Sequence, residues 1–298
     1  MDVPVAIGVD LGGTMIKGVL IQEDGKILNQ MTRHTNDAGD TSIFTWKEEI
    51  KKVVEELKSK GEADIPIGIC APGIPDTSHQ AIAYMPGRLE GLEKLNWAEY
   101  LAEKDTYVIN DAKAAMMAEH QFGVGRGIDN LILLTLGTGV GGAIVIGGKL
   151  YDGWLNRAGH LGHLSQQPFG EEGIFNLPGT LEMAIGNATV LQRSKGQFHS
   201  THELVQAYEG GDDWATLVWL ESIKALAMGI SSLINILSPE LIILSGGITM
   251  AEEALFRPLK NYMKLFEWLP GTLPTPIVKA NFTSFAGAVG AAVFALKH

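Results

Sequence analysis

Two stretches of the chain share one hydrophobic pattern, in which two apolar runs flank a short turn of glycine and threonine. They are AIGVDLGGTMIKGVLI at residues 6–21 and LILLTLGTGVGGAIVIGG at residues 131–148. Aliphatic and β-branched runs are typical of strands, and glycines permit the positive φ angles of a tight connection. We therefore expect each stretch to form a β-hairpin.

The remaining apolar positions predict helices that alternate with short strands. Apolar residues at helical spacing between residues 46 and 57, opposite a charged face, indicate an amphipathic helix. We expect further strands at residues 65–73, 106–109 and 241–247, and further helices at residues 112–122, 214–237 and 285–298. Residues 151–179 are irregular and rich in glycine, so we interpret them as a long loop of the kind that often carries function. Two hairpins among these elements predict a duplicated α/β fold.

The length of the chain predicts two domains. At 298 residues it corresponds to about two domains of ordinary size. No low-complexity linker separates the halves, so we place the boundary at a hinge near Asn110. The predicted domains are residues 1–109, completed by the helix at 285–298, and residues 110–284.

Composition restricts the classes of protein and the setting. Cys70 is the single cysteine, which excludes an intrachain disulfide and a cysteine-based metal site and favours a reducing, cytoplasmic location. No export signal precedes the first strand, and glycine, proline or charge interrupts the apolar runs before a membrane-spanning length. The net charge of −11 argues against nucleic acid as a general partner. We expect neither a nucleic-acid nor a membrane partner.

The two hairpin turns suggest phosphate binding. Glycine turns expose backbone N–H groups and let a phosphate approach closely. The first turn holds Gly12, Gly13 and Thr14, and the second holds Gly137, Thr138 and Gly139. Asp10 ends the first strand, where its carboxylate would hold Mg²⁺ directly or through water. Either turn alone is explained by an ordinary hairpin, but two such turns favour one shared phosphate ligand.

Two further strand ends carry candidate residues. Gly246 and Gly247 follow a strand and precede a helix, where ligands often bind, although a plain connection explains this turn equally well. Asn110 and Asp111 also stand between a strand and a helix. Both residue types cap helices well, while a carboxylate there would accept the proton of an attacking hydroxyl in phosphoryl transfer. The sequence leaves both interpretations open, and one residue can cap while the other reacts.

Two histidines and a glutamate form the last candidate group. His160 and His163 lie in RAGHLGHL, and Glu182 follows in GTLE. A metal site needs another convincing ligand, and the loop offers only Glu171 and Glu172 without cysteine. We therefore favour a polar pocket for a hydroxyl-rich ligand, with surface histidines as the plain alternative.

Taken together and in order, the motifs DLGGT, APG, NDA, LGTGVGG, GHLGH, GTLE and SGG resemble the ROK family of sugar kinases and sugar-responsive repressors. The resemblance spans nearly the whole chain. It implies an actin-like ATPase fold of two RNase H-like α/β domains, with ATP and a sugar in a central cleft, and a homodimer. The resemblance also implies roles for individual residues. Asp10 and residues 12–14 would face phosphate and Mg²⁺, residues 137–142 would form a second phosphate loop, and Gly246 and Gly247 would lie near adenosine. Asn110, His163 and Glu182 would hold sugar hydroxyls, and Asp111 would be the catalytic base.

The chain departs from the family pattern at three places. His160 stands where members commonly carry the glutamate of E-x-G-H, so we expect an imidazole in the sugar pocket. The three cysteines of the family zinc motif correspond to Gly173, Phe175 and Thr180, so we expect no structural zinc. The usual sugar-contacting asparagine after APG is not recognisable in residues 76–92.

The leading hypothesis is an ATP-dependent kinase for a hexose or a hexose derivative. The alternative from another class is a non-catalytic sugar-binding or sugar-sensing protein. The family's repressors carry a DNA-binding domain before this core, and we expect none here because the first phosphate turn follows directly after Asp10. A third hypothesis keeps the enzyme and changes the donor to polyphosphate. The sequence leaves open the sugar, the hydroxyl that is phosphorylated and the oligomeric state.

Overall fold

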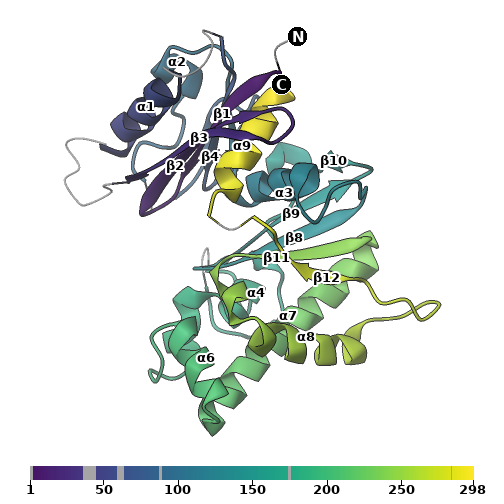
Figure 1. Cartoon of the computed structure of the whole chain (residues 1–298). Helices are drawn as coiled ribbons and strands as arrows, with labels where there is room; N and C mark the ends of the chain where they lie inside the picture. Colours follow the sequence, from purple (N-terminus) through teal and green to yellow (C-terminus); the bar gives the residue numbers. More distant parts are fainter. Residues whose placement is uncertain (1–2, 36–44, 59–63, 87–88, 174–175, 283) are drawn as a thin grey trace. The chain divides into compact units, whose positions relative to one another are not determined.

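The computed structural model describes residues 3–35, 45–58, 64–86, 89–173, 176–282 and 284–298 (Figure 1). The chain forms two compact units. The first unit comprises Met1–Gly127, Leu150–Ala158 and Asn281–His298, and the second comprises Ile128–Lys149 and Gly159–Ala280. Each unit is therefore assembled from segments that are distant in sequence.

The first unit is built on a mixed sheet with the strand order β3-β2-β1-β4-β7. Its strands are β1 (Val5–Leu11), β2 (Met15–Gln22), β3 (Ile27–His34), β4 (Ile67–Ala71) and β7 (Thr106–Asn110). The first three are antiparallel neighbours, whereas β1, β4 and β7 run parallel to one another. A small second sheet pairs β5 (Ile74–Pro75) with β6 (Ile82–Tyr84).

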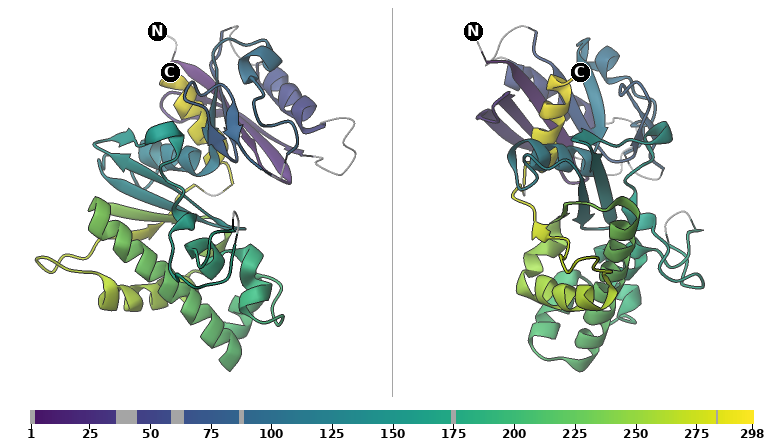
Figure 2. Two further views of the ribbon diagram at one scale, coloured as in Figure 1. Left: turned by 180° about the vertical axis from the view of Figure 1, so that it is seen from behind. Right: turned by 90° about the vertical axis from the view of Figure 1, so that its right-hand side faces the viewer.

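Helices cover both faces of this sheet. The amphipathic helix α1 (Thr45–Lys58) and the short α2 (Trp97–Leu101) share one core with the side chains of one face. On the other face lie α3 (Asp111–Phe122) and the C-terminal α9 (Ala286–Leu296), which pack against each other. The helix α9 is composed mainly of small residues. Figure 2 shows α9 in yellow beside the purple strands of the sheet in both views.

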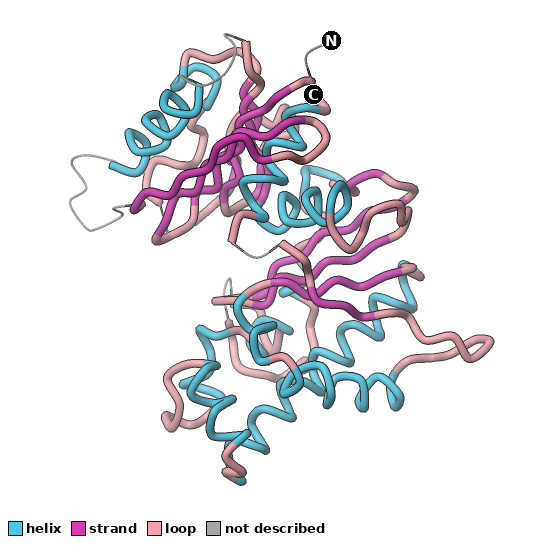
Figure 3. The backbone as a smooth tube through the Cα atoms, in the orientation of Figure 1, coloured by secondary structure: helices cyan, strands magenta, loops and turns pink. Residues whose placement is uncertain are grey.

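The second unit repeats the plan with the strand order β10-β9-β8-β11-β12. Its strands are β8 (Leu131–Leu136), β9 (Val140–Ile146), β10 (Lys149–Leu150), β11 (Leu241–Ser245) and β12 (Ile277–Lys279). Its helices are α4 (Leu181–Ile185), α5 (Val190–Arg193), α6 (Thr201–Glu209), α7 (Asp213–Leu237) and α8 (Glu253–Phe266). Figure 3 shows α7 and α8 in cyan on one face of the magenta strands.

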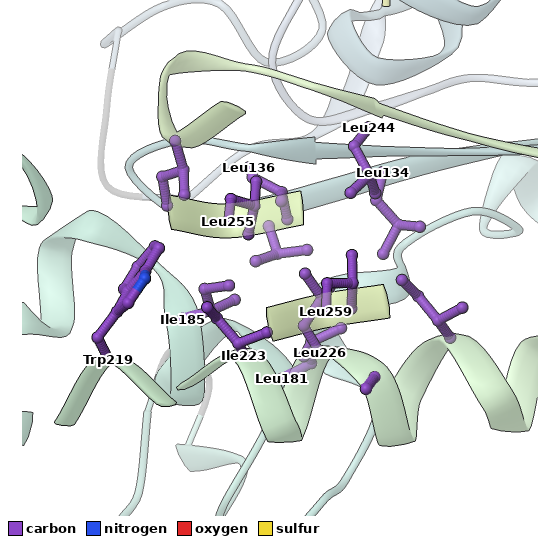
Figure 4. Packing of buried hydrophobic residues seen from close by; sticks show 14 of the residues in the cluster. Leu134, Leu136, Leu181, Ile185, Trp219, Ile223, Leu226, Leu244, Leu255 and Leu259 are labelled. Atoms are coloured by element: carbon purple, nitrogen blue, oxygen red, sulfur yellow. The ribbon is translucent and has the colours of Figure 1, made fainter. Parts of the chain in front are cut away.

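The core of this unit forms between the sheet and α7. Leu134, Leu136 and Leu244 of the strands face Trp219 and Ile223 of the helix (Figure 4). By length and composition α7 is the one helix among the described residues that is able to cross a membrane. Its apolar side chains instead enclose this core, which is the behaviour of an internal helix.

The main predictions from the sequence are confirmed. Both Gly-Thr stretches form antiparallel hairpins, β1–β2 and β8–β9. The helices predicted at 46–57, 112–122, 214–237 and 285–298 match α1, α3, α7 and α9, each within three residues. The strands predicted at 65–73, 106–109 and 241–247 match β4, β7 and β11.

The division into units differs from the predicted boundary between residues 109 and 110. The first unit continues to Gly127 because α3 packs against α9 and against the same sheet. It also takes Leu150–Ala158 out of the predicted second domain. The C-terminal helix lies in the first unit, as in the predicted division. The sequence did not predict β3, α6 or α8, nor the packing of α3 against α9.

Candidate functional site

Three parallel strands of the first unit end at one edge of the sheet and bring the predicted residues there together. Asp10 of β1 is paired in register with Cys70 of β4. Ala71 of β4 is paired with Asn110, the last residue of β7, and Asp111 follows directly. Because the carboxyl ends of parallel strands are a common position for ligands, this edge is the candidate site of the first unit.

The Asp10 carboxyl lies half-buried at this edge. Burial raises its pKa to about 6, and the negative charge of Asp111 contributes in the same direction. A hydrogen bond from the Cys70 thiol and the charge of Lys17 act in the opposite direction and lower this pKa. The two carboxylates therefore interact, and the site would gain from a cation bound beside Asp10.

The first turn of α9 packs closely against Asp10. A Cβ atom at Gly287 would lie 2.7 Å from Cγ of Asp10, 2.8 Å from its Oδ2 and 2.9 Å from Sγ of Cys70. No side chain fits there without displacing the carboxylate. The N-terminus of a helix carries partial positive charge and favours a nearby anion, so α9 helps to keep Asp10 in place.

The Gly-Thr turn of the first hairpin is held by Thr35. The N–H of Gly12 donates to the Met15 carbonyl at 3.1 Å, which closes the turn. The hydroxyl of Thr35 donates to the Gly12 carbonyl at 2.7 Å, and its N–H donates to the Thr14 carbonyl at 2.9 Å. Gly13 and Thr14 remain exposed. The turn is thus fixed from one side and open to a ligand on the other.

Asn110 and Asp111 have different positions at the start of α3. Asn110 is buried and caps the helix, because its Oδ1 accepts hydrogen bonds from the N–H groups of Ala112 at 3.0 Å and Lys113 at 3.3 Å. Its Nδ2 donates to the carbonyl of Gly73 in the APG turn at 3.0 Å. The sequence left open which of the two residues caps the helix, and in the structure Asn110 is the N-cap.

The Asp111 side chain is exposed, and its Oδ1 accepts the N–H of Ala112 at 2.8 Å. Partial exclusion of water around this carboxyl raises its pKa, while the hydrogen bonds from Ala112 and Asn110 act in the opposite direction. The net effect is a pKa above the usual range of an aspartate, which makes this carboxylate a better proton acceptor. Asp111 is available to accept a proton.

The two glycine turns of the second unit meet at one edge of its sheet. Ser245, the last residue of β11, is paired with Thr135 near the end of β8. Gly246 follows with a φ of 93° and lies against the backbone of Leu136, which directly precedes the 137–139 turn. Thr138 is exposed. The structure thus places the two predicted nucleotide-binding turns of this unit side by side.

Glu182 contacts the 137–139 turn directly. Its Oε2 accepts the N–H of Val140 at 2.9 Å, and a Cβ atom at Gly139 would overlap its carboxylate. The residues just after α4 support the same turn, because the N–H groups of Asn187 and Ala188 donate to the carbonyls of Gly137 and Thr138, each at 2.9 Å. Glu182, predicted as a sugar ligand, therefore also orders a phosphate-type turn.

His160 and His163 lie at a short 3₁₀ turn, η2 (Leu161–His163), which contacts β9 and α4. Their rings are stacked, with centroids 6.1 Å apart and an interplanar angle of 11°. Both are half-buried. Since α4 carries Glu182, the second unit brings all three of these predicted sugar-site residues into one neighbourhood.

No group of three or more His, Cys, Asp or Glu side chains that would hold a metal ion occurs within the described ranges. Of the three positions that correspond to the family zinc cysteines, Phe175 lies outside the described residues. Gly173 donates its N–H to the Leu177 carbonyl at 3.0 Å, and Thr180 caps α4. These two positions serve the local backbone.

Sequence reasoning missed several residues that shape these sites. Cys70 and Gly287 contact Asp10, and Thr35 holds the first turn. Two cations also lie near the predicted residues, the buried Lys113 and the half-buried Arg193. A lysine within the apolar stretch AKAAMM was the one available signal. The other contacts join residues that are far apart in sequence.

Two α/β units, one with a glycine turn beside interacting carboxylates and one with paired glycine turns, define a sugar kinase of the actin-like ATPase fold. The profile of the ROK family matches residues 6–298. The chain therefore belongs to the ROK family.

Individual relatives agree with this assignment. Glucokinase from Thermotoga maritima is 33% identical over 312 aligned positions, and the aligned region covers 96% of this chain and 95% of that protein. N-acetylmannosamine kinase from Escherichia fergusonii is 26% identical over 298 residues, with 97% of each covered. The crystal structure of the ROK hexokinase from Thermus thermophilus superposes with a TM-score of 0.83 at 26% identity, covering 98% of both chains.

Proposed function

We propose that this chain transfers the γ-phosphoryl group of ATP to a hydroxyl group of a hexose or a hexose derivative, with Asp111 as the general base. The observation that carries the proposal is the pair of interacting carboxylates on one sheet edge, Asp10 half-buried and Asp111 exposed. Phosphoryl transfer to an alcohol uses one carboxylate as the base that accepts the proton of the attacking hydroxyl, and another carboxylate to hold the cation that accompanies the phosphates. The two positions suit these two tasks.

Asp111 accepts the proton of the sugar hydroxyl while the hydroxyl oxygen attacks the γ-phosphorus and ADP leaves. The N-terminus of α3 and the N–H of Ala112 favour the ionised, proton-accepting form of this carboxyl. Asn110 fixes the start of α3 by capping it, and so fixes the direction from which Asp111 acts.

Mg²⁺ suits Asp10. Magnesium prefers oxygen ligands, and a half-buried carboxylate that is close to a second negative charge is stabilised by a divalent cation. Asp10 would hold the ion directly or through water, and the bound ion would neutralise charge on the transferring phosphoryl group.

The glycine turns are assigned to the nucleotide and the polar group near α4 to the sugar. We assign Gly12, Gly13, Thr14, Gly137, Thr138 and Gly139 to the phosphates, and Gly246 and Gly247 to the adenosine. Asn110, His160, His163 and Glu182 are assigned to the sugar hydroxyls. The exposure of residues 13, 14 and 138 supports the phosphate assignment.

The test is ADP release from MgATP across a panel of hexoses, N-acetylhexosamines and ketoses, with identification of the phosphorylated sugar by mass spectrometry. We expect sugar-dependent ADP release with at least one member of the panel. Sugar binding without ADP release would indicate a non-catalytic sugar-binding protein. Turnover with polyphosphate but not with ATP would indicate a sugar kinase whose phosphoryl donor is polyphosphate.

We also propose a cytoplasmic homodimer. The single buried cysteine supports a reducing compartment, and the net charge of −11 is unfavourable for nucleic-acid binding. Light scattering of the purified protein tests the oligomeric state, and a monomeric mass at micromolar concentration would contradict the dimer.

A further inference from the structure

Arg193 is a half-buried cation near the 137–139 turn. One of its guanidinium nitrogens, Nη1, donates to the Gly186 carbonyl at 2.8 Å and to the Thr189 hydroxyl. Its other two nitrogens, Nε and Nη2, are buried and make no hydrogen bond within the described residues. Its guanidinium is also absent from every ion pair found among those residues.

Gly186 connects this guanidinium to the turn. A Cβ atom at Gly186 would lie 3.0 Å from the Thr138 carbonyl oxygen and 3.4 Å from Cα of Gly139. The next two residues donate their N–H groups to the carbonyls of Gly137 and Thr138. Gly186 therefore lies between the Arg193 guanidinium and the predicted phosphate turn.

An incompletely paired, buried guanidinium is costly for folding, so its position calls for a compensating role. A purely structural role would be to cap the carbonyl end of α4, for which Nη1 alone is sufficient. The Glu182 carboxylate also touches the turn and adds a negative charge next to the place proposed for phosphates. A positive charge behind the turn offsets it.

We propose that Arg193 is a positioning residue that holds the 137–139 turn through Gly186 and supplies positive charge behind it for the phosphates of the nucleoside triphosphate. Burial lowers the pKa of Arg193 to about 10, so the guanidinium stays charged at neutral pH. The inference rests on the proposed function, because it takes the turn to be a phosphate site.

The proposal makes a prediction that a structural cap does not. If Arg193 acts by charge, its loss weakens binding in proportion to the charge of the ligand. If it only shapes the turn through its hydrogen bonds to Gly186 and Thr189, Arg193→Lys loses as much ATP affinity as Arg193→Met, and the affinity does not follow the charge at this position when the pH is raised.

The experiment is isothermal titration of ATP, ADP and adenosine with the wild-type protein and with the Arg193→Met and Arg193→Lys variants. We expect Arg193→Met to weaken ATP binding about tenfold, ADP binding less, and adenosine binding less than about twofold. Arg193→Lys should retain most of the ATP affinity at pH 7 because it keeps the charge. In turnover assays Arg193→Met should raise KM for ATP and leave KM for the sugar unchanged.

Arg257→Met is the matched control, since Arg257 is an exposed arginine of α8 in the same unit. We expect its three affinities to equal those of the wild type. Equal losses for all three ligands in Arg193→Met, or no loss, would overturn the role of Arg193. A wild-type protein that binds none of the three nucleotides or nucleosides would instead overturn the proposed function.

A second measurement covers the case in which Arg193→Met does not fold. A buried lysine loses its proton at lower pH than an exposed one. Raising the pH of the Arg193→Lys variant therefore removes the positive charge at position 193 without a further substitution. The ATP affinity of Arg193→Lys should fall from pH 7 to pH 9 relative to wild type, whose guanidinium stays charged over this range, while its adenosine affinity stays constant. Parallel ATP profiles for the two proteins would contradict the proposal.

Discussion

Lys113 and Asp152 form an ion pair with Nζ and Oδ1 2.5 Å apart, which ties α3 to the Leu150–Ala158 segment of the first unit. The Lys113 side chain is 2% exposed and that of Asp152 is 29% exposed. The same Nζ donates to the Asn156 carbonyl at 3.0 Å, and the Asn156 amide donates to the Asp76 carbonyl at 2.7 Å. One buried lysine therefore orders two segments around the helix that carries Asp111.

Replacement of Asp152 by alanine should destabilise the protein, because it leaves the buried Lys113 ammonium without its counter-ion. We expect the free energy of unfolding in urea to fall by about 2 kcal/mol, less than for a fully buried pair because Asp152 retains contact with water. The control is Glu221→Ala, which removes an exposed pair with Lys224 and should change stability by at most about 0.5 kcal/mol. Equal effects of the two variants would contradict the role of the buried pair.

Asp111→Asn should reduce kcat by about two to four powers of ten, the usual consequence of losing a general base. ATP affinity and thermal stability should stay near wild type, because the side chain is exposed and the helix is capped by Asn110. Asp105→Asn, at an exposed aspartate just before β7, is the control and should keep full turnover. Near-normal kcat in purified Asp111→Asn would rule out this base.

His160→Glu should shift sugar preference towards glucose. A carboxylate accepts hydrogen bonds from two neighbouring hydroxyls, whereas a neutral imidazole offers one donor and one acceptor. An unpaired polar group in the pocket costs about 1 to 3 kcal/mol, enough to change the preference by about tenfold. The ratio of kcat/KM for glucose to that for the best sugar should rise in His160→Glu but not in His202→Glu, at an exposed histidine of α6. An unchanged ratio would show that His160 does not contact the sugar.

Protonation of His79 should destabilise the first unit in mildly acidic solution. Burial lowers the pKa of this imidazole from 6.5, and its Nδ1 lies 3.1 Å from the Val108 carbonyl oxygen. A group whose folded-state pKa is lowered contributes stability that is present above pH 6.5 and is lost as the pH falls through the folded-state value. His79→Gln should therefore lose less stability than wild type between pH 7 and pH 5 in urea titrations. The control is His34→Gln, at an exposed histidine of β3, which should follow the wild-type curve.

Chelation of metal should leave the fold intact. With Gly173, Phe175 and Thr180 at the positions of the family cysteines, the chain lacks the thiolates that bind structural zinc. We expect less than stoichiometric zinc by elemental analysis and an unchanged Tm after treatment with EDTA. Stoichiometric zinc in the purified protein, or unfolding on chelation, would refute this expectation.

The local elements that the sequence predicted well are those whose signal lies within one segment. The hairpins at residues 6–21 and 131–148 combine apolar runs with glycine turns, and α7 combines length with a continuous apolar composition. In contrast, β3 alternates exposed and half-buried residues at the edge of its sheet, so its apolar signal is weak. The helix α8 contains Pro258, which interrupts the pattern typical of a helix.

For the candidate site, too, the sequence predicted what lies within one segment and not which distant segments meet. Asp10 and Asp111 were identified as separate motifs, because each follows an apolar run and stands in a recognisable context of glycine or asparagine. Only the parallel register of β1, β4 and β7 brings them to one edge, since strand order depends on packing between distant segments. The contact of Gly287 with Asp10 depends on a helix that returns from the end of the chain.

The sequence by itself determined the hairpins, the major helices, the family and the types of residue available for phosphate and sugar. The tertiary structure alone decided that α3 belongs with the first unit and that Asn110 caps this helix while Asp111 stays exposed. It also decided that Lys113 is buried and that two guanidinium nitrogens of Arg193 are enclosed near the second glycine turn. The physical reason is that hydrophobic periodicity and turn chemistry act over a few residues. Burial, charge pairing and pKa shifts arise from neighbours that only the folded chain brings together.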